Sequence, residues 1–379
     1  MRFLAASLVS VLALGLPFAG AGRAGAAVPA SSDSAASAGP AARGGSGVAG
    51  NFDVQQVAPG VYAVVRWDPP GLMCDGNCMF VVNDSDVVVV DAPESTREVL
   101  AAIRRVTLKP VTYVVNTHWH DDHVTGNQVY RDSFPGVQFV AHDATREYLP
   151  VKGAEARRQM IQGAPAGADM LRGLLRKGRS LEGGPLSDEE RESYASDIAL
   201  VEHYLEVVPK TDYVLPTITL HDSLTLHRGG RVIKILCVGP GHTGGDVVVW
   251  LPAERVLASG DLVAGPVPLV GADQSHVGEW SAALEALRAL RPAVIVPGHG
   301  PVLRDDSYLE LMSRLFASVT RQVRAAVSRG ETLEQVRKSV DLAEFKEKFA
   351  GKSHVRAALF ARYVAAPAVS AAYREAGGK

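Results

Sequence analysis

The sequence predicts a layered α/β domain that carries a helical insertion and a helical C-terminal extension. Short β-branched runs bounded by turn residues indicate strands, and they occur in two sets. A stretch with helical periodicity lies within each set, and further helical segments lie between the sets and after them. With 47% hydrophobic and 21% charged residues, the 379-residue chain has the composition of a globular protein with a sizeable core. This order of elements is typical of sheets covered by helices.

The first residues are expected to be an export signal. Residues 1–27 combine a basic residue, Arg2, with an apolar stretch and a small-residue segment around Ala26, which is the pattern of a cleavable signal peptide. Residues 28–50 are rich in Ala, Gly, Ser and Pro and predict a flexible linker. We therefore expect a periplasmic or secreted mature protein without a stable membrane anchor.

Strands and helices follow in a regular order. Strands are expected at 61–67, 78–82, 87–91, 111–116 and 137–141, with a helix at 95–106. After a helical insertion over about 151–210, strands are expected at 214–220, 223–227, 231–238, 246–252, 255–260 and 293–298, with a helix at 277–290. Capping boxes at 187–190 and 332–335 predict two helix starts. The predicted domain spans 51–304, and residues 305–379 form the C-terminal helical extension.

Charge and cysteine content argue against two classes of protein. Lys plus Arg is 39 and Asp plus Glu is 41, and this near-neutral balance is unlike that of a dedicated nucleic-acid-binding protein. Three cysteines cannot support a disulfide framework, so a metal site would rest on the 11 histidines and on carboxylates. We expect a small-molecule substrate and no nucleic-acid partner, and the oligomeric state stays open.

The strongest chemical signal is a cluster of histidine and aspartate directly after the strand at 111–116. The segment contains His118, His120, Asp122 and His123 in the pattern H-x-H-x-D-H. In an extended chain, residues two apart point the same way, so His118 and His120 share a direction. Asp122 and His123 follow where the chain turns and can face a second point nearby. One short loop therefore offers two groups of ligands, as two neighbouring metals require.

Three further candidates, His242, Asp261 and His299, are predicted at strand ends and are flanked by glycines. Glycine lets the backbone turn tightly and approach a buried ion closely. Since each candidate follows an apolar run, we expect all three to come off the same edge of a sheet. Together with the first cluster they make seven candidate metal ligands.

This set of residues resembles the ligand set of the metallo-β-lactamase superfamily, whose members are metal-dependent hydrolases with an αβ-βα sandwich fold. The resemblance covers about residues 52–303 and fills all seven ligand positions. It implies one metal held by His118, His120 and His242, a second held by Asp122, His123 and His299, and Asp261 as a bridge between them.

The resemblance also implies a mechanism. The donor set suits two Zn²⁺ ions per chain, and Fe or Mn would fit it as well. Two cations roughly 3.5–4 Å apart share a water and lower its pKa to about 7. We expect the resulting metal-bound hydroxide, together with Asp122, to perform the attack on a carbonyl without a protein nucleophile. The expected enzyme is an exported dinuclear hydrolase of an ester, lactone, thioester or amide.

Two positions separate this chain from one major group of β-lactamases. That group has Cys at the position of Asp261 and a Lys three residues later, where this chain has Ala264. The Asp-bridged arrangement resembles glyoxalase II-like thioesterases and lactonases instead. The alternatives are a true metallo-β-lactamase and a non-catalytic metal-binding or sensor protein.

The segment around residue 70 leaves two questions open. Residues 66–73 join two predicted strands and form either a substrate flap or a loop packed on its own sheet. Cys74 and Cys78 could form a disulfide in an oxidising compartment. Metal binding by this pair is the weaker interpretation, because no second Cys or His pair accompanies it. Cys237 lies in an apolar strand and is expected to pack in the interior.

Overall fold

The computed structural model describes residues 42–43 and 47–378. The predicted signal peptide at 1–27 and most of the predicted linker at 28–50 lie outside these residues. The described part of the linker contacts the domain, because residues 42–43 pair with 53–54 and Arg66 donates a hydrogen bond to the Val48 carbonyl oxygen at 2.9 Å. Among the described helices, none combines the length and the apolar character that crossing a membrane requires.

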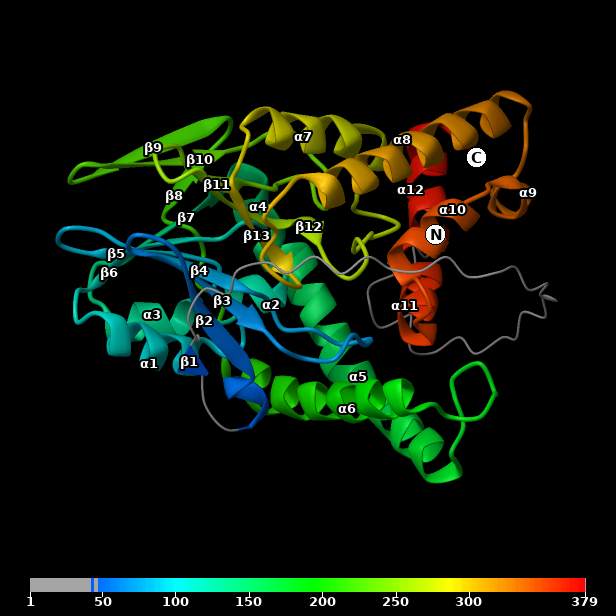
Figure 1. Ribbon diagram of the computed structural model, residues 1–379, viewed down its shortest axis with the longest axis horizontal. Coiled ribbons are helices and arrows are strands. Elements are labelled where there is room, and N and C mark those ends of the chain that lie inside the picture. Colours follow the sequence, from blue (N-terminus) through cyan, green and yellow to red (C-terminus); the bar gives the residue numbers. More distant parts are fainter. Residues whose placement is uncertain (1–41, 44–46, 379) are drawn as a thin grey trace, which may run out of the picture.

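Two mixed sheets form the centre of the molecule (Figure 1). In the first sheet the strands lie in chain order: β1 (Ala42–Arg43), β2 (Phe52–Ala58), β3 (Val61–Arg66), β4 (Cys78–Val82), β5 (Val87–Val90), β6 (Val111–Val115), β7 (Gln138–His142) and β8 (Ile218–Leu220). The second sheet contains β9 (Ser223–Arg228), β10 (Arg231–Leu236), β11 (Val248–Leu251), β12 (Val256–Ala264) and β13 (Val294–His299). Neighbouring strands are antiparallel from β1 to β5 and from β9 to β12, and parallel from β5 to β8 and between β12 and β13.

Helices occupy the outer faces, the insertion and the C-terminal extension. The α-helices are α1 (Thr96–Val106), α2 (Asp121–Val124), α3 (Asn127–Ser133), α4 (Asp143–Tyr148), α5 (Ala154–Lys177), α6 (Asp188–Val207), α7 (Val277–Ala289), α8 (Ser307–Ser328), α9 (Leu333–Ser339), α10 (Ala343–Ala350), α11 (His354–Leu359) and α12 (Ala366–Glu375). Shorter 3-10 turns are η2 (Val48–Gly50) and η4 (Val208–Lys210), and π-helical turns are η3 (Leu149–Gly153) and η5 (Phe360–Ala365).

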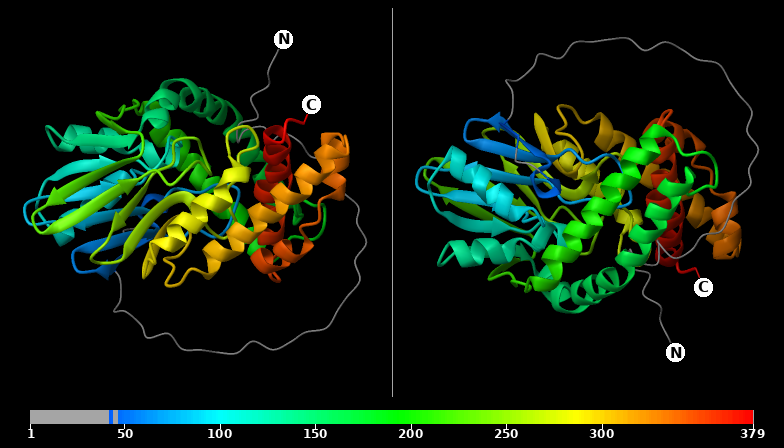
Figure 2. Two further views of the ribbon diagram at one scale, coloured as in Figure 1. Left: turned by 90° about the horizontal axis from the view of Figure 1, so that it is seen from above. Right: turned by 90° about the horizontal axis from the view of Figure 1, so that it is seen from below.

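Three clusters of buried apolar side chains hold the sheets and helices together as layers. Buried side chains of both sheets, such as Val88 and Val249, pack between the sheets. The other face of the first sheet is covered by α1 and α3, with Ile103 and Tyr130 in that cluster. The other face of the second sheet is covered by α7 and α8, whose Trp280 and Phe316 rings stack. The arrangement is an αβ-βα sandwich, as the sequence predicts, and Figure 2 shows the two sheets between their helices.

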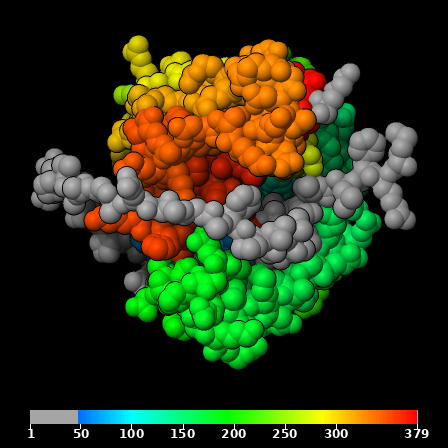
Figure 3. Space-filling model, turned by 90° about the vertical axis from the view of Figure 1, so that its right-hand side faces the viewer, coloured from blue at the N-terminus to red at the C-terminus, as the bar shows by residue number. Residues whose placement is uncertain are grey.

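The insertion and the extension lie at the same end of the sandwich. Helices α5 and α6 form their own small apolar cluster, and α6 also packs against α11 of the extension, where Ser353 donates to Glu189. Figure 3 looks onto this side, with the extension in orange and red above the insertion in green. Both capping boxes are present, with Ser187 starting α6 and Thr332 starting α9.

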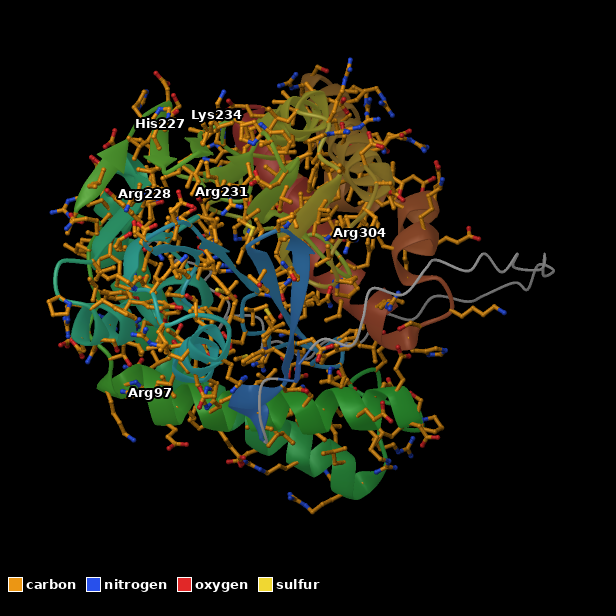
Figure 4. All side chains as sticks on the ribbon, turned by 60° about the vertical axis from the view of Figure 1, so that its left-hand side comes forward. Arg97, His227, Arg228, Arg231, Lys234 and Arg304 are labelled. Atoms are coloured by element: carbon orange, nitrogen blue, oxygen red, sulfur yellow. The ribbon has the colours of Figure 1, made fainter. Side chains whose placement is uncertain are left out.

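The two sheets are also linked by ion pairs at the β9–β10 hairpin. Arg228 pairs with Asp86 of the first sheet's β4–β5 turn, and Arg231 donates to the Val82 carbonyl oxygen at 2.8 Å. Arg231 also pairs with Glu254 at 2.7 Å. Figure 4 shows His227, Arg228, Arg231 and Lys234 on this hairpin, where charged side chains protect the exposed strand β9 at the edge of the sheet.

The structure differs from the expected elements in several places. Strand β2 was not predicted, since Gln55 and Gln56 interrupt its apolar alternation, yet Phe52 and Val54 face the core. Helices α2, α3 and α4 were not predicted either, because each has only four to seven residues. Strand β8 begins at Ile218 instead of residue 214, after Pro216, which has no backbone N–H to donate.

Candidate metal centre

The first cluster lies where the chain passes from β6 into α2. His118 and His120 are in the connecting loop, and Asp122 and His123 are in the short helix that follows. His118 and His123 are buried, at 1% and 0% exposed. The rings of His118 and His120 have centroids 4.6 Å apart. The turn into α2 separates the two pairs, so they face neighbouring points.

The other three candidates come from the second sheet. His242 is in the loop after β10, and His299 is the last residue of β13. Asp261 lies inside β12 and not after it as expected, because this strand continues to Ala264. The register between β12 and β13 shifts on both sides of Gly260, which turns the Asp261 side chain toward the first cluster. The centre therefore lies between loops of both sheets.

One group of donors consists of His118, His120, His242 and Asp261, whose ligand atoms lie within 4.8 Å of one another. His242 Nε2 is 2.9 Å from His120 Nδ1, and Asp261 Oδ2 is 3.5 Å from His242 Nε2. The four side chains come from three segments, the loop after β6, the loop after β10 and strand β12, so the grouping is a product of the tertiary fold.

A second group surrounds His299. Its Nε2 is 3.1 Å from Asp122 Oδ2 and 3.4 Å from His123 Nε2. Asp261 Oδ1 is 3.3 Å from His123 Nε2 and 3.4 Å from His299 Nε2. The two oxygens of Asp261 thus face the two different groups, which suits a bridging carboxylate.

Buried polar atoms without partners support a cation at this place. Asp261 Oδ1 and His118 Nε2 are both buried and make no hydrogen bond. Leaving a buried polar atom unpaired is costly, so such atoms are rare unless they serve a ligand or ion. Seven histidine and aspartate donors, two of them unpaired, fit divalent cations such as Zn²⁺.

The proton affinities of the donors differ between the two groups, because, against the effect of burial, the carboxylates around His123 and His299 raise the pKa of both rings well above the ordinary value. Burial lowers the pKa of His242 to about 3, and burial with His123 and His120 lowers the pKa of His118 well below its ordinary value. These rings are neutral at pH 7, as metal ligands must be. Burial alone would raise the pKa of Asp122, but His123 and His299 lower it to about 2.

Partners outside the seven candidate ligands orient the imidazole rings. His123 Nδ1 donates to Asp91 Oδ2 at 2.9 Å, and His242 Nδ1 donates to the Leu269 carbonyl oxygen at 2.7 Å. Such contacts hold the ring so that Nε2 faces the metal position. Asp91 also accepts a hydrogen bond from the Thr117 backbone N–H at 2.7 Å, and it has a φ of 64°. Asp91 is not among the residues that the sequence predicts at the site, although an acid directly after the buried run at 87–90 is a usable signal.

Asp121 connects the metal-binding loop to the insertion. Its carboxylate pairs with Arg157 of α5 at 2.7 Å and accepts hydrogen bonds from the Tyr204 and Tyr213 hydroxyls at 2.8 and 2.9 Å. Arg157 also stacks over the Tyr213 ring at 3.7 Å. These residues hold α2, which carries Asp122 and His123. No local sequence signal relates them, because they are far apart in the chain.

The segment at 66–73 begins on its own sheet, where Arg66 pairs with Phe52 of β2, and ends against the helical additions. Met73 joins the α5–α6 cluster, and Leu72 packs against the core of the extension. Cys74 and Cys78 are both free thiols, and Cys237 is partly buried against the core between the sheets. Ala264 is fully buried, so a lysine there would be buried as well.

Comparison with known proteins gives a consistent result. Residues 72–299 match the family model of the metallo-beta-lactamase superfamily. A linear primary-alkylsulfatase from a Pseudomonas species is 29% identical over 237 residues, which is 60% of this chain and 42% of that protein. A type 2 metallo-beta-lactamase from Bacillus cereus is 34% identical over 124 residues, 32% of this chain and 47% of that protein. A hydroxyacylglutathione hydrolase from Gloeobacter violaceus is 38% identical over 82 residues, 21% of this chain and 32% of that protein.

The chain spans less than half the length of these relatives. By their names, all three are hydrolases, although they act on chemically different bonds. The family model covers more than half of the chain, from the loop that carries Cys74 to the last ligand, His299. With its αβ-βα sandwich and its His and Asp donors between the two sheets, the chain belongs to the metallo-beta-lactamase superfamily.

Proposed function

We propose that this protein is a dinuclear metal-dependent hydrolase that cleaves an ester, lactone, thioester or amide bond of a small molecule. The observation that carries the proposal is the convergence of seven His and Asp donors, among which two buried atoms, His118 Nε2 and Asp261 Oδ1, make no hydrogen bond. A structural cluster of this kind would pair its buried polar atoms internally. Unpaired donors in a buried cluster favour bound cations over a purely structural role.

The donors divide between two positions. His118, His120 and His242 would hold one cation, Asp122, His123 and His299 the other, and Asp261 would face both. When bound, two such cations supply Lewis acidity and make a shared water acidic near neutral pH, so no Ser or Cys nucleophile is needed. Zn²⁺ is the proposed metal because imidazole and carboxylate donors suit it.

The chain's own side chains provide positioning and proton transfer. Asp122 is the proposed catalytic carboxylate, because its side chain is 19% exposed whereas that of Asp261 is 2% exposed. It can therefore meet a substrate while its Oδ2 stays 3.1 Å from His299 Nε2. Gln274 places its amide nitrogen 2.9 Å from His120 Nε2, at the partly buried side of the first group. Its amide is available to orient a polar group of the substrate.

A sulfate ester is the second candidate substrate. The reason is the alkylsulfatase relative, whose similarity covers 60% of this chain, more than the similarity to the Bacillus cereus β-lactamase or the hydroxyacylglutathione hydrolase. β-Lactam hydrolysis ranks lower, because Asp261 takes the place of a cysteine and a buried Ala264 the place of a drug-binding lysine.

Metal analysis and the substitution Asp261→Ala test the proposal together. We expect about two metals per chain in the wild-type protein. Losing the shared carboxylate should lower the metal content and reduce kcat/KM by at least about 10²-fold, or about 2.7 kcal/mol. Glu192→Ala, at an exposed position of α6, is the control and should change neither value.

The assay uses a carboxyl ester, a thioester, an alkyl sulfate and a β-lactam side by side. The proposal would be wrong if the wild type holds no more than one metal after reconstitution, or if Asp261→Ala keeps two metals and full activity. Preference for the β-lactam by orders of magnitude would reverse the ranking of substrates.

We also propose that the protein is exported, on the basis of the signal-like residues 1–27. Mass spectrometry of protein from its native host should find a mature N-terminus near Ala26 or Ala27. A protein that retains Met1 and Arg2 would argue against export through this segment.

A further inference from the structure

A thiol lies beside the second group of donors. Cys74 Sγ is 4.0 Å from His299 Nε2. Cys74, Asp122 and His299 each offer a donor atom, and these three atoms lie within 4.8 Å of one another. Cys74 comes from the loop between β3 and β4 and therefore from a different segment than the seven His and Asp donors. Its position at the centre is not explained by the proposed ligand set.

A second observation points to a ligand at the same place. Asp261 Oδ1, which has no hydrogen-bond partner and belongs to a side chain that is 2% exposed, lies 3.4 Å from the same His299 Nε2. His299 thus belongs both to the cluster with Cys74 and Asp122 and to a cluster with His123 and Asp261. Three segments direct donor atoms toward His299, namely the Cys74 loop, α2 and β12, and one of these atoms is buried without a hydrogen bond.

The loop that carries Cys74 is held firmly from both sides. Asp75 accepts hydrogen bonds from the Glu94 backbone N–H at 2.9 Å and from the Ser95 hydroxyl at 2.6 Å. Asn77 donates to the carbonyl oxygens of Pro297 and Gly300, at 2.9 and 2.8 Å, on either side of His299. The thiol is therefore tied to the strand end that carries His299.

The insertion and the extension hold the other side of the same loop. Asp197 of α6 accepts a hydrogen bond from the Met73 backbone N–H at 2.9 Å. Tyr363 of η5 donates to the Leu72 carbonyl oxygen at 2.7 Å. A Cβ at Gly76 would lie 2.4 Å from the Asp122 carbonyl oxygen, so the loop also passes directly beside α2. These contacts fix the backbone on both sides of Cys74.

A disulfide with Cys78 does not account for this placement. Cys78 lies in β4 and is buried in the apolar cluster between the first sheet and α1, at 2% exposed. Cys74 is solvent-accessible, and both residues are free thiols. The Cys74 Sγ instead lies 4.0 Å from His299 Nε2, within reach of a metal bound there.

We propose that Cys74 is a further ligand of the second metal position, added to Asp122, His123 and His299. Zinc–sulfur and zinc–nitrogen distances of about 2.3 and 2.1 Å place two ligands of one tetrahedral ion roughly 3.6 Å apart. The observed separation of 4.0 Å is close to this value. A thiolate makes the position softer and favours Zn²⁺ or Co²⁺ over Mn²⁺. The inference rests on the proposed metal centre and adds a ligand to it.

Cobalt substitution tests the ligand by spectroscopy, independently of activity. The full-length protein is stripped of metal and titrated with Co²⁺, and its visible and near-ultraviolet absorption is recorded. We expect ligand-field bands from cobalt and, in addition, an intense near-ultraviolet thiolate-to-cobalt band. Cys74→Ser should lose the thiolate band and keep ligand-field bands. Cys237→Ser, which removes a half-buried thiol elsewhere, should keep both.

The possible outcomes distinguish the role of Cys74 from the existence of the metal centre itself. Two bound cobalt ions without a thiolate band in the wild type would overturn the role of Cys74 and leave the metal centre intact. A thiolate band that persists in Cys74→Ser would also overturn it. Failure to bind cobalt at all would overturn the metal centre and the inference together.

Alkylation of the wild-type protein gives a second measurement that needs no variant. Iodoacetamide labelling is followed by mass spectrometry of the peptide that contains Cys74, with and without Zn²⁺. We expect Zn²⁺ to reduce the rate of Cys74 labelling at least tenfold and to leave Cys237 labelling unchanged. Equal labelling of Cys74 with and without bound Zn²⁺ would contradict the proposal.

Discussion

At the scale of single residues, the candidate metal centre consists of buried imidazole rings and buried carboxylates whose charges shift one another's pKa values. Burial alone would lower the pKa of His123, but Asp122, Asp261 and Asp91 raise it well above its ordinary value. Three carboxylates around one imidazole leave an excess of negative charge, which a bound cation would neutralise. His242 and His118 also lie near Asp261, but burial outweighs its attraction and keeps the pKa of both rings low. The two groups of donors therefore differ electrostatically before any metal binds.

The carboxylate of Asp121 should matter for metal binding although it faces the insertion. Asp121→Asn leaves Arg157 buried without its charged partner, and breaking a buried pair costs about 3–5 kcal/mol. Loosening α2 should also weaken metal affinity about 10–100-fold, the usual range for residues that support ligands. Thermal unfolding and metal titration measure the two effects.

Asp169→Asn is the matched control for this substitution. Asp169 pairs with Arg172 at the same 2.7 Å, but its side chain is 75% exposed, so its loss should cost less than about 1 kcal/mol. If both variants behave alike, the Asp121 cluster does not support the centre.

Asp197 should make stability depend on pH. Burial raises its pKa to about 6, against 3.8 for an ordinary carboxyl, and its Oδ2 has no hydrogen-bond partner. Between about pH 4 and 6 the folded state then binds more protons than the unfolded state, so this residue lowers stability as the pH rises. Over this pH range the ionisation of Asp197 should lower the free energy of unfolding by about 3 kcal/mol.

The variant Asp197→Asn should remove this dependence. The melting temperature of Asp197→Asn minus that of the wild type should increase from pH 4 to pH 7, because only the wild-type side chain becomes charged in this range. Arg362 is the basic group that faces Asp197, so the comparison is repeated in Arg362→Gln. A difference between wild type and Asp197→Asn that stays constant over this pH range would contradict the prediction.

At the scale of elements, the close approach of β12 and β13 sets the position of Asp261. A Cβ at Gly298 would lie 1.9 Å from Asp261 Oδ1, so only glycine fits there. Gly298→Ala should displace the carboxylate, lower metal content and reduce activity at least about tenfold. Gly173→Ala in α5 is the control, because nothing lies near its Cβ and alanine favours a helix by up to about 1 kcal/mol. Metal content equal to wild type in Gly298→Ala would refute this constraint.

At the scale of the whole molecule, the C-terminal extension completes the core of the domain. Leu309, Met312, Leu315, Phe316 and Val319 of α8 are all fully buried against α7 and the second sheet. Each buried side chain of this size contributes roughly 1.5–3 kcal/mol, so their summed burial is comparable to the stability of a whole domain, about 5–15 kcal/mol. The extension is thus an integral layer of the sandwich.

Removal of residues 305–379 should therefore prevent folding. We expect the truncated chain to be insoluble or to bind a dye for exposed apolar surface, with no cooperative thermal transition. A shorter truncation that removes only 376–379 should leave the melting temperature within a few degrees of wild type. A soluble truncated chain that melts cooperatively and binds two metals would show that the extension is a separate unit.

Local patterns in the sequence identified the candidate ligands and many of the elements. The period-two spacing of His118 and His120 and the glycines beside His242, Asp261 and His299 all act over a few residues. Capping boxes are equally local, and both helix starts that they predicted are confirmed. Apolar β-branched runs identified most strands, because a buried strand needs such side chains on both faces.

Only the tertiary structure decided what surrounds those ligands. Asp121 meets Arg157, Tyr204 and Tyr213, and Cys74 meets His299, across separations of 36 to 225 residues that leave no periodic trace in the sequence. The placement of the ligands between loops of two sheets, and the clamping of the Cys74 loop by both helical additions, are likewise long-range. A short spacing in the sequence indicates which nearby side chains can point in the same direction. Which distant side chains then meet depends on how complete layers pack, and the sequence determines this only through the whole fold.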